Sequence, residues 1–202
     1  WEDRQMTLRA ALLATALVAL PTLAFAADPD LSTYPSKEWL SIGGDWKNSR
    51  YSTLGQITPA NVRNLKGAWV AHLSSGLGTR YGLSATPIVQ DGVMYVTSGN
   101  NEVYAFDART GSMIWQYFSK IDQTNATNCC GWLNRGVAVG DGKVFQGQLD
   151  GQMVALDAKT GDVVWKSKLA VPTADGGVYA ITAAPLYYNG MLYTGKIGRA
   201  HV

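Results

Sequence analysis

Two adjacent cysteines, Cys129 and Cys130, are the residues of this chain whose type and spacing most directly suggest chemistry. They are the only cysteines, and the sequence Gly-Trp-Leu-Asn-Arg follows them at 131–135. In an oxidising compartment, two lone neighbouring thiols are expected to join to each other. Adjacent Cα atoms lie about 3.8 Å apart, less than the roughly 4.4–6.8 Å of ordinary disulfides, so such a ring is strained. It closes no useful loop, which favours a local binding role over a stabilising one. The alternative is a pair of reduced, buried thiols.

The N-terminal residues predict export. A basic start at 6–9, a largely apolar run at 10–20 and Ala-Phe-Ala at 24–26 are the three parts of a secretory signal peptide, with cleavage expected after Ala26. The apolar run is too short for a membrane span, which needs about 20 residues. We therefore expect a soluble protein in the periplasm with no membrane span. The alternative is a buried N-terminal helix.

The two ends of the chain are expected to lie outside the natural protein. Residues 1–5 precede Met6 and are interpreted as translated upstream sequence, while residues 196–202 resemble the translation of a sequencing adaptor. Residues 27–195 then form the N-terminal part of a larger protein. The whole chain has 17 basic and 15 acidic side chains, and residues 27–195 contain 13 of each, so that part has no net charge. A neutral chain without a basic cluster is a poor partner for nucleic acid.

An internal repeat with a period of 50 residues organises the chain. The sequence Asp-Gly-Val-Met-Tyr at 91–95 aligns with Asp-Gly-Lys-Val-Phe at 141–145, and 105–111 aligns with 155–161. A third copy begins at 189–193, and residues 65–69 resemble the closing strand of an earlier one. Short Val- and Tyr-rich runs separated by Asp-Gly, Asn-Gly or Thr-Gly predict antiparallel strands joined by tight turns.

Certain repeated residues are expected to be structural. Gly111 and Gly161 should supply positive φ before a new strand, and Trp115 and Trp165 follow at matching positions, as Trp69 does in the earlier copy. Such a tryptophan most simply packs one repeat against the next. Four short strands per 50 residues predict an all-β fold, a partial β-propeller comprising about three blades. A solenoid of the same strands is the alternative.

The motifs together resemble a known family. Gly-Gly-Asp-Trp at 43–46, Asn-Ser-Arg-Tyr-Ser at 48–52, Gln-Ile-Thr-Pro at 56–59 and the Asp-x-x-Thr-Gly-x-x-x-Trp repeats resemble the start of alcohol dehydrogenases that depend on pyrroloquinoline quinone (PQQ). The adjacent cysteines and Asn-Arg at 134–135 strengthen the match. The resemblance runs from about residue 39 to 195. It implies an eight-bladed propeller with the quinone in a central funnel.

The resemblance also implies roles for individual residues. Cys129 and Cys130 match the family's vicinal disulfide, which stacks on the quinone ring, and Arg135 matches an arginine that meets the anionic edge of the cofactor. Without the resemblance, Arg135 would more often be a surface ion-pair partner. Thr182 matches a threonine that hydrogen-bonds the cofactor. Ser84 stands where the family usually has an acidic residue, which puts the affinity for the cofactor in doubt.

The implied reaction is the oxidation of a primary or related alcohol to an aldehyde, with a metal polarising the quinone and an electron acceptor such as a cytochrome c. Calcium is the default metal and a lanthanide is possible. The family's metal ligands and catalytic aspartate are expected beyond residue 195, so no catalytic or metal-binding residue is assigned here.

Other functions have less support. The sequence lacks a His-x-x-x-His zinc motif and a Cys-x-x-Cys-His haem motif. A non-enzymatic propeller, such as the scaffold lipoprotein of outer-membrane barrel assembly, would need a cysteine at the cleavage site and has no use for a Cys-Cys pair. The related sugar dehydrogenases begin with several membrane spans and lack the vicinal cysteines.

Overall fold

A computed structural model describes residues 30–73, 81–122, 131–169 and 180–195. The predicted signal peptide, Cys129, Cys130 and residues 196–202 lie outside the described residues. Within these ranges the chain forms β-strands and one short 3-10 helix, with no α-helix. The elements are η1 (Val62–Asn64), β1 (Tyr81–Leu83), β2 (Ile88–Gln90), β3 (Val93–Thr97), β4 (Val103–Asp107), β5 (Met113–Tyr117), β6 (Trp132–Asn134), β7 (Ala138–Gly140), β8 (Lys143–Gly147), β9 (Gln152–Asp157), β10 (Val163–Lys168), β11 (Leu186–Tyr188) and β12 (Met191–Tyr193).

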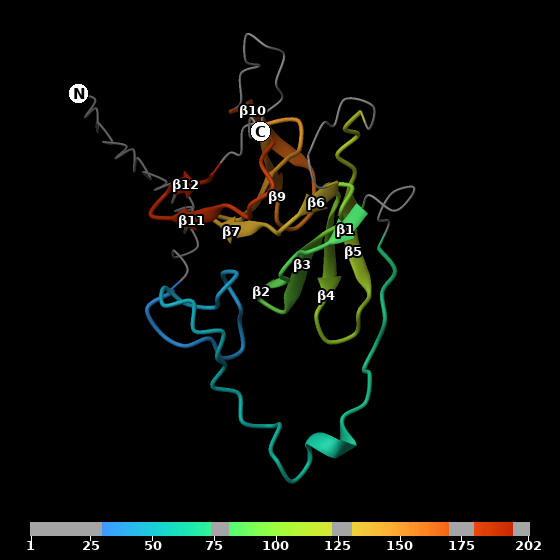
Figure 1. The fold of residues 1–202 in the computed structure, drawn as a ribbon, viewed down its shortest axis with the longest axis vertical. Coiled ribbons are helices and arrows are strands. Elements are labelled where there is room, and N and C mark those ends of the chain that lie inside the picture. Colours follow the sequence, from blue (N-terminus) through green and yellow to red (C-terminus); the bar gives the residue numbers. More distant parts are fainter. Residues whose placement is uncertain (1–29, 74–80, 123–130, 170–179, 196–202) are drawn as a thin grey trace, which may run out of the picture.

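The strands form two complete four-stranded antiparallel sheets, which we call the first and second blades. The first has the order β2-β3-β4-β5 and the second the order β7-β8-β9-β10. Figure 1 shows the two blades as successive layers, with β11 and β12 opening a third sheet beside β7. Equivalent strands of the two complete blades begin 49 to 50 residues apart, and those of the third sheet begin 48 residues after their equivalents, as the repeat predicts. The prediction of an all-β fold built from repeated blades is confirmed.

The tight turns predicted from Asp-Gly and Asn-Gly are present in all three copies. Asp91 and Gly92 have φ of 51° and 76°, and Asp141 and Gly142 have φ of 49° and 65°. Positive φ at both central residues is the type I′ geometry, whose twist matches that of the flanking strands. The Asn-Gly turn at 189–190 between β11 and β12 repeats it, with φ of 50° and 74°. These turns fix the first hairpin of each blade.

The second repeated turn, Asp-x-x-Thr-Gly, joins the third and fourth strands of each blade. The Asp107 carboxylate accepts hydrogen bonds from the amides of Thr110 (2.7 Å) and Arg109 (3.0 Å). These bonds, led by the one from Thr110, lower the pKa of Asp107. The equivalent Asp157 makes the same contacts to the amides of Thr160 and Lys159, which lower its pKa in the same way. The turn is thus closed by a carboxylate that is ionised at neutral pH.

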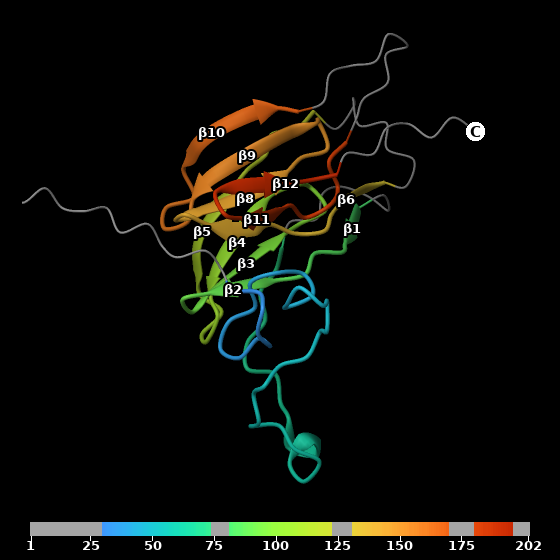
Figure 2. The ribbon, with the colours of Figure 1, turned by 90° about the vertical axis from the view of Figure 1, so that its left-hand side faces the viewer.

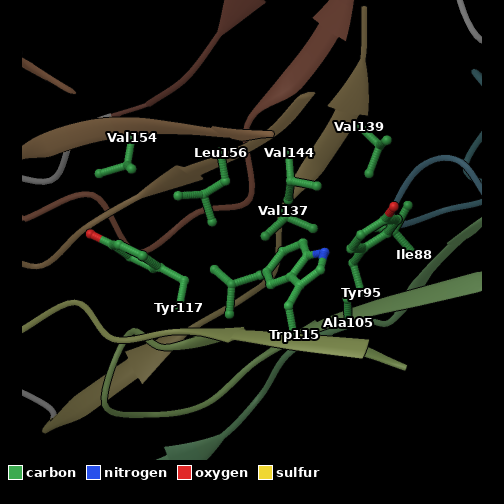
Figure 3. Close-up of a cluster of buried hydrophobic side chains, with 11 residues drawn as sticks. Ile88, Tyr95, Ala105, Trp115, Tyr117, Val137, Val139, Val144, Val154 and Leu156 are labelled. Atoms are coloured by element: carbon green, nitrogen blue, oxygen red, sulfur yellow. The ribbon is translucent and has the colours of Figure 1, made fainter. Parts of the chain in front are cut away.

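The contact between the two blades is the main hydrophobic core. Its buried members come from both sheets: Ile88, Tyr95, Val103, Ala105, Trp115 and Tyr117 from the first, and Val139, Val144, Val154 and Leu156 from the second, with Val137 just before β7. Figure 3 shows the Trp115 indole extending from β5 toward the side chains of the second blade. The apolar faces of successive blades therefore cover each other, as propeller packing requires.

Two contacts between successive repeats are centred on a tryptophan and a glycine. Trp115 lies over the turn of the second blade, where a Cβ added at Gly161 would meet its ring at 2.6 Å. Its indole N–H donates to the carbonyl of Ala158 at 3.0 Å. Trp69 lies in the same way over Gly111, and its indole N–H donates to the carbonyl of Ala108 at 3.2 Å. Only glycine leaves room for the ring and accepts the φ of +73° and +78° at these positions.

Trp165 occupies the equivalent position in the second blade but has a different environment. Its ring packs on Phe145 of its own sheet, with centroids 6.0 Å apart. It is 37% exposed, whereas Trp115 is 8% exposed. All six residues of β10 are exposed. Within the described residues, the Trp165 side of β10 is therefore uncovered, whereas Phe145 and Ala155 of the same sheet pack with Tyr187 of the third sheet.

The motif at 43–52 forms a compact loop against the sheets. The Asp45 carboxylate accepts hydrogen bonds from the amide and hydroxyl of Ser49, at 2.9 and 2.7 Å. Trp39 forms an antiparallel bridge with Val89 of β2, and Trp46 contacts Tyr188 of β11 edge to face. Figures 1 and 2 show this blue loop beside β2 and β11, while the chain that follows it extends away from the sheets. The loop therefore joins the first blade to the third.

Candidate functional site

Three segments that lead into β2, β7 and β11 lie side by side, and we call residues 81–86, 132–136 and 180–184 the entry segments. β1 pairs with β6 in parallel, so the first two segments run in the same direction, as both views of the ribbon show. The amide of Thr86 donates to the carbonyl of Arg135 at 3.1 Å, and the amide of Arg135 donates to the carbonyl of Thr182 at 3.0 Å. The fold thus brings together residues that are about 50 positions apart.

Arg135 and Thr182, both candidate cofactor-binding residues from the sequence, are in direct contact. The guanidinium Nη1 of Arg135 donates to the Thr182 hydroxyl oxygen at 2.7 Å. Gly136 follows with φ of +136°, and a Cβ there would lie 3.1 Å from the Thr86 carbonyl oxygen and 3.5 Å from Ala184 Cβ. The close approach of the three entry segments therefore requires the glycine after Arg135.

The charge of Arg135 is available to a ligand. The residue is exposed, and within the described part of the chain no carboxylate forms an ion pair with it, because the pair found there joins Lys143 to Asp141. A guanidinium has five N–H donors in a rigid fork, and a single bond to Thr182 leaves most of them unused. The Thr182 oxygen accepts from Arg135, so its own O–H can donate outward. The pair is suited to bind a carboxylate or another planar anion.

Ser84 lies in the first entry segment, two residues before Thr86, and it is exposed. The structure therefore places it on the segment that pairs with Arg135, without a carboxylate at this position. Cys129 and Cys130 precede the second entry segment but lie outside the described residues. Three successive repeats thus contribute described residues to this site, namely Ser84, Thr86, Arg135 and Thr182.

Asn134 is a residue of the site for which sequence reasoning named no function. It is fully buried behind Arg135, and its side chain contacts Thr97, Asn101 and Gly147 of the two blades. A polar amide next to the candidate arginine was the only signal in the sequence. Apart from the nearby Gly136 amide, the partners of this side chain lie 13 to 37 residues away, so no local pattern could identify them.

Neither a metal-ligand cluster nor a membrane-spanning helix is present in the described residues. No group of three or more His, Cys, Asp or Glu side chains there could hold a metal ion. No helix among them is long and apolar enough to cross a membrane. A cavity of about 190 Å³ separates the 31–46 region from β7 and β11 and is lined largely by apolar residues. Its buried carboxylate, Asp45, is already bonded to Ser49, so the cavity offers no free charged group.

The comparison with protein families gives a match over most of the chain. Residues 39–197 match the family described as PQQ: Glucose/ethanol/alcohol dehydrogenase, beta-propeller domain. The chain is 41% identical over 189 residues to the 1-butanol dehydrogenase (cytochrome c) of Thauera butanivorans, which covers 93% of this chain and 25% of that protein. It therefore spans about a quarter of the length of this curated relative.

Solved structures agree in fold. The quinohemoprotein alcohol dehydrogenase from Comamonas testosteroni superposes with a TM-score of 0.71 at 41% identity, over 80% of this chain and 23% of that chain. A europium-containing methanol dehydrogenase gives a TM-score of 0.70 at 36% identity, over 83% of this chain and 28% of that chain. BamB from Moraxella catarrhalis, at 21% identity and a TM-score of 0.51 over 64% of this chain and 37% of that chain, shares the fold alone.

Proposed function

The chain belongs to the family of PQQ-dependent glucose, ethanol and alcohol dehydrogenases with a β-propeller domain, and from that premise we propose that it is part of a periplasmic quinoprotein that oxidises a primary or related alcohol to an aldehyde. Residues 27–195 are the first blades of the propeller, residues 6–26 the signal peptide, and residues 1–5 and 196–202 lie outside the natural protein. The catalytic carboxylate and the metal ligands come from later blades.

The observation that carries this proposal is the exposed guanidinium of Arg135, bonded to Thr182 at the meeting point of three repeats. The donors present fit PQQ, which is a planar quinone bearing carboxylates. Arg135 would pair with a carboxylate through parallel N–H donors, and Thr182 would donate its hydroxyl hydrogen. Because Arg135 is unpaired within the described residues, binding an anion here displaces no internal ion pair. Cys129 and Cys130 are proposed to cover one face of the ring as a disulfide.

When bound, PQQ supplies a two-electron acceptor for the alcohol, and a divalent or trivalent cation makes its carbonyl more electrophilic. The residues of this chain bind and orient rather than react. Arg135 neutralises the anionic edge, Thr182 fixes the direction of the guanidinium, and the rigid entry segments hold both in place. Ser84 supplies a neutral hydroxyl where the family usually has a charged carboxylate, so we expect the quinone to be oriented less strongly on the side of the first entry segment.

The metal and the electron acceptor are proposed from the relatives. A similar solved structure is a europium-containing methanol dehydrogenase, so a lanthanide is a candidate beside calcium. The Thauera relative is named a cytochrome c-linked dehydrogenase, and a cytochrome c is the proposed acceptor here. A small alcohol is the proposed substrate.

Reconstitution of the full-length protein tests the proposal. The purified apoprotein is supplied with PQQ and either calcium or a lanthanide, and reduction of an artificial dye is followed with 1-butanol, ethanol or glucose. We expect alcohol-dependent reduction that requires both the quinone and a metal, and that falls in the Cys129→Ala/Cys130→Ala variant. Quinone binding without alcohol oxidation, or oxidation of glucose alone, would contradict the assignment.

A further inference from the structure

The side chain of Asn134 uses all its hydrogen-bonding capacity inside the protein. Its amide Nδ2 donates to the Gly147 carbonyl at 2.7 Å and to the Asn101 Oδ1 at 3.2 Å. Its Oδ1 accepts from the Gly136 amide at 3.0 Å and from the Thr97 hydroxyl at 3.3 Å. The residue is 0% exposed, so none of these bonds is exchanged with solvent. An amide buried this way fixes its surroundings strongly, since each lost bond leaves an unpaired polar group.

These four bonds join the two blades to the residues on either side of Arg135. Thr97 belongs to β3, Asn101 to the turn before β4, and Gly147 to β8. Asn101 strengthens the link, because its Oδ1 also accepts the amide of Leu149 at 3.1 Å. Asn101 has φ of 60°, a conformation that asparagine tolerates better than most residues.

Arg135 is consequently held on both sides. Asn134 before it is locked by its side chain, and Gly136 after it donates its amide to that same side chain. The Arg135 amide and carbonyl are bonded to Thr182 and Thr86. These bonds fix the backbone of the exposed Arg135, which sets the point and direction at which its side chain leaves the chain.

We propose that Asn134, paired with Asn101, is a positioning residue that sets the direction of the Arg135 guanidinium toward the anionic ligand. The inference rests on the proposed function for the identity of the ligand, but its structural part concerns the protein alone. Without the Asn134 amide, the Gly147 carbonyl and the Gly136 amide lose their partner, and the peptide units flanking Arg135 can rotate. The guanidinium then samples directions that do not bind the ligand.

A double-mutant cycle in the full-length metal-loaded apoprotein tests the proposal, with PQQ affinity measured by quenching of tryptophan fluorescence. We expect Asn134→Ala to weaken binding about tenfold, as the loss of a well-placed charge-assisted bond would. In the Arg135→Ala background the same substitution should change affinity by less than about twofold, because the group that it positions is gone. Equal effects in both backgrounds would overturn the proposal.

Gln148→Leu is the matched control. Gln148 is also a buried amide between the two blades, 1% exposed, and its side chain bonds the Tyr117 hydroxyl at 3.2 Å. Within the described part of the chain, its side-chain hydrogen bonds go to Tyr117 and Gln146 and not to the second entry segment. We expect this variant to lose thermal stability as Asn134→Ala does while keeping PQQ affinity within about twofold of wild type. If Gln148→Leu lost as much PQQ affinity as Asn134→Ala, the effect of Asn134 would be that of any buried amide, and the proposal would be overturned.

Hydrogen exchange gives a readout that needs no quinone. Peptides covering residues 132–138 should exchange at least about tenfold faster in Asn134→Ala, since the Arg135 and Gly136 amides lose protection, but not in Gln148→Leu. If Asn134→Ala does not fold, Thr97→Val replaces it in this experiment. Thr97→Val removes one donor to Asn134 and should increase the exchange rate by a smaller factor. Unchanged exchange in both variants would overturn the proposal, whereas a wild type that binds no PQQ would contradict the proposed function alone.

Discussion

At the scale of single residues, the site depends on one exposed charge supported by buried amides. Arg135 could be selected from the sequence because it follows the cysteines and matches a family motif, and Thr182 because it precedes Ala-Ala-Pro. Their contact could not be predicted from spacing, because 47 residues separate them. Asn134 was noted only as part of the Asn-Arg motif, and its role and that of Asn101 were not predicted for the same reason: most of their partners are set by blade packing, which no local pattern records.

Tyr95 provides a pH prediction at this scale. Burial in the inter-blade core, followed by the charges of Asp91 and Asp157, raises the pKa of its phenol from 10.0 to about 12. The neutral phenol donates to the Ala158 carbonyl at 3.1 Å. Because the folded pKa lies above the unfolded value, this contribution to stability is complete below pH 10 and is lost as the pH rises toward 12.

Chemical denaturation of the full-length protein and of Tyr95→Phe tests this prediction. The variant should be about 1 kcal/mol less stable at pH 8, because the Ala158 carbonyl loses one of its two donors and keeps only the Trp115 indole N–H. The difference should shrink or change sign by pH 11.5, since phenylalanine does not ionise. A difference that stays constant across this range would show that Tyr95 does not titrate on unfolding.

At the scale of elements, strands and turns were the most predictable part of the chain. Asp-Gly and Asn-Gly dictate the hairpin geometry locally, so these turns follow from two residues each. The β-bulges were not predicted. Pairing of β5 shifts so that Trp115 faces Ala105 and Met113 faces Phe106, and pairing of β10 shifts in the same way before Trp165. The extra residue has no sequence signature, yet it precedes the tryptophan that docks on the next blade.

Gly161→Ala tests the docking of tryptophan on glycine. The added methyl would lie 2.6 Å from the Trp115 ring, at a φ of +78°. The conformational cost of about 1–2 kcal/mol and an overpacking cost of about 1–3 kcal/mol should together lower the unfolding free energy by about 2–5 kcal/mol.

Gly142→Ala is the control for this prediction. Gly142 also has positive φ, +65°, but a Cβ there meets no atom within 4 Å. It should therefore show the conformational cost alone, about 1–2 kcal/mol. Equal losses in the two variants, measured by urea unfolding of the full-length protein, would mean that Trp115 moves away at little cost.

At the scale of the whole molecule, the second blade packs against the first on one side and against β11 on the other, but β10 is left uncovered. The uncovered face of β10 includes Trp165, which is 37% exposed, whereas the equivalent Trp115 of the covered first blade is 8% exposed. The family membership and the share of the relatives that the chain spans, 25% of the Thauera protein, indicate that more blades complete the propeller. The number of blades was predicted from the resemblance, because a repeat alone does not distinguish a closed ring from a solenoid.

Trp165→Ala in the full-length protein tests whether a following blade covers this face. If it does, the variant should lose about 3–5 kcal/mol, as expected for a buried tryptophan and as for Trp115→Ala. Thermal unfolding of both variants gives the comparison. A loss below about 1 kcal/mol for Trp165→Ala, beside a large loss for Trp115→Ala, would show that the β10 face stays open.

The most direct test of the central claim is an equilibrium titration of the full-length apoprotein with PQQ in the presence of calcium or a lanthanide, comparing wild type, Arg135→Ala and Arg109→Ala. Arg109 is an exposed arginine on the Asp107 turn, so it controls for a general loss of positive charge. We predict saturable binding by wild type and Arg109→Ala, and affinity lower by about 10- to 100-fold in Arg135→Ala. No saturable binding by wild type, or equal affinity in all three proteins, would contradict the account.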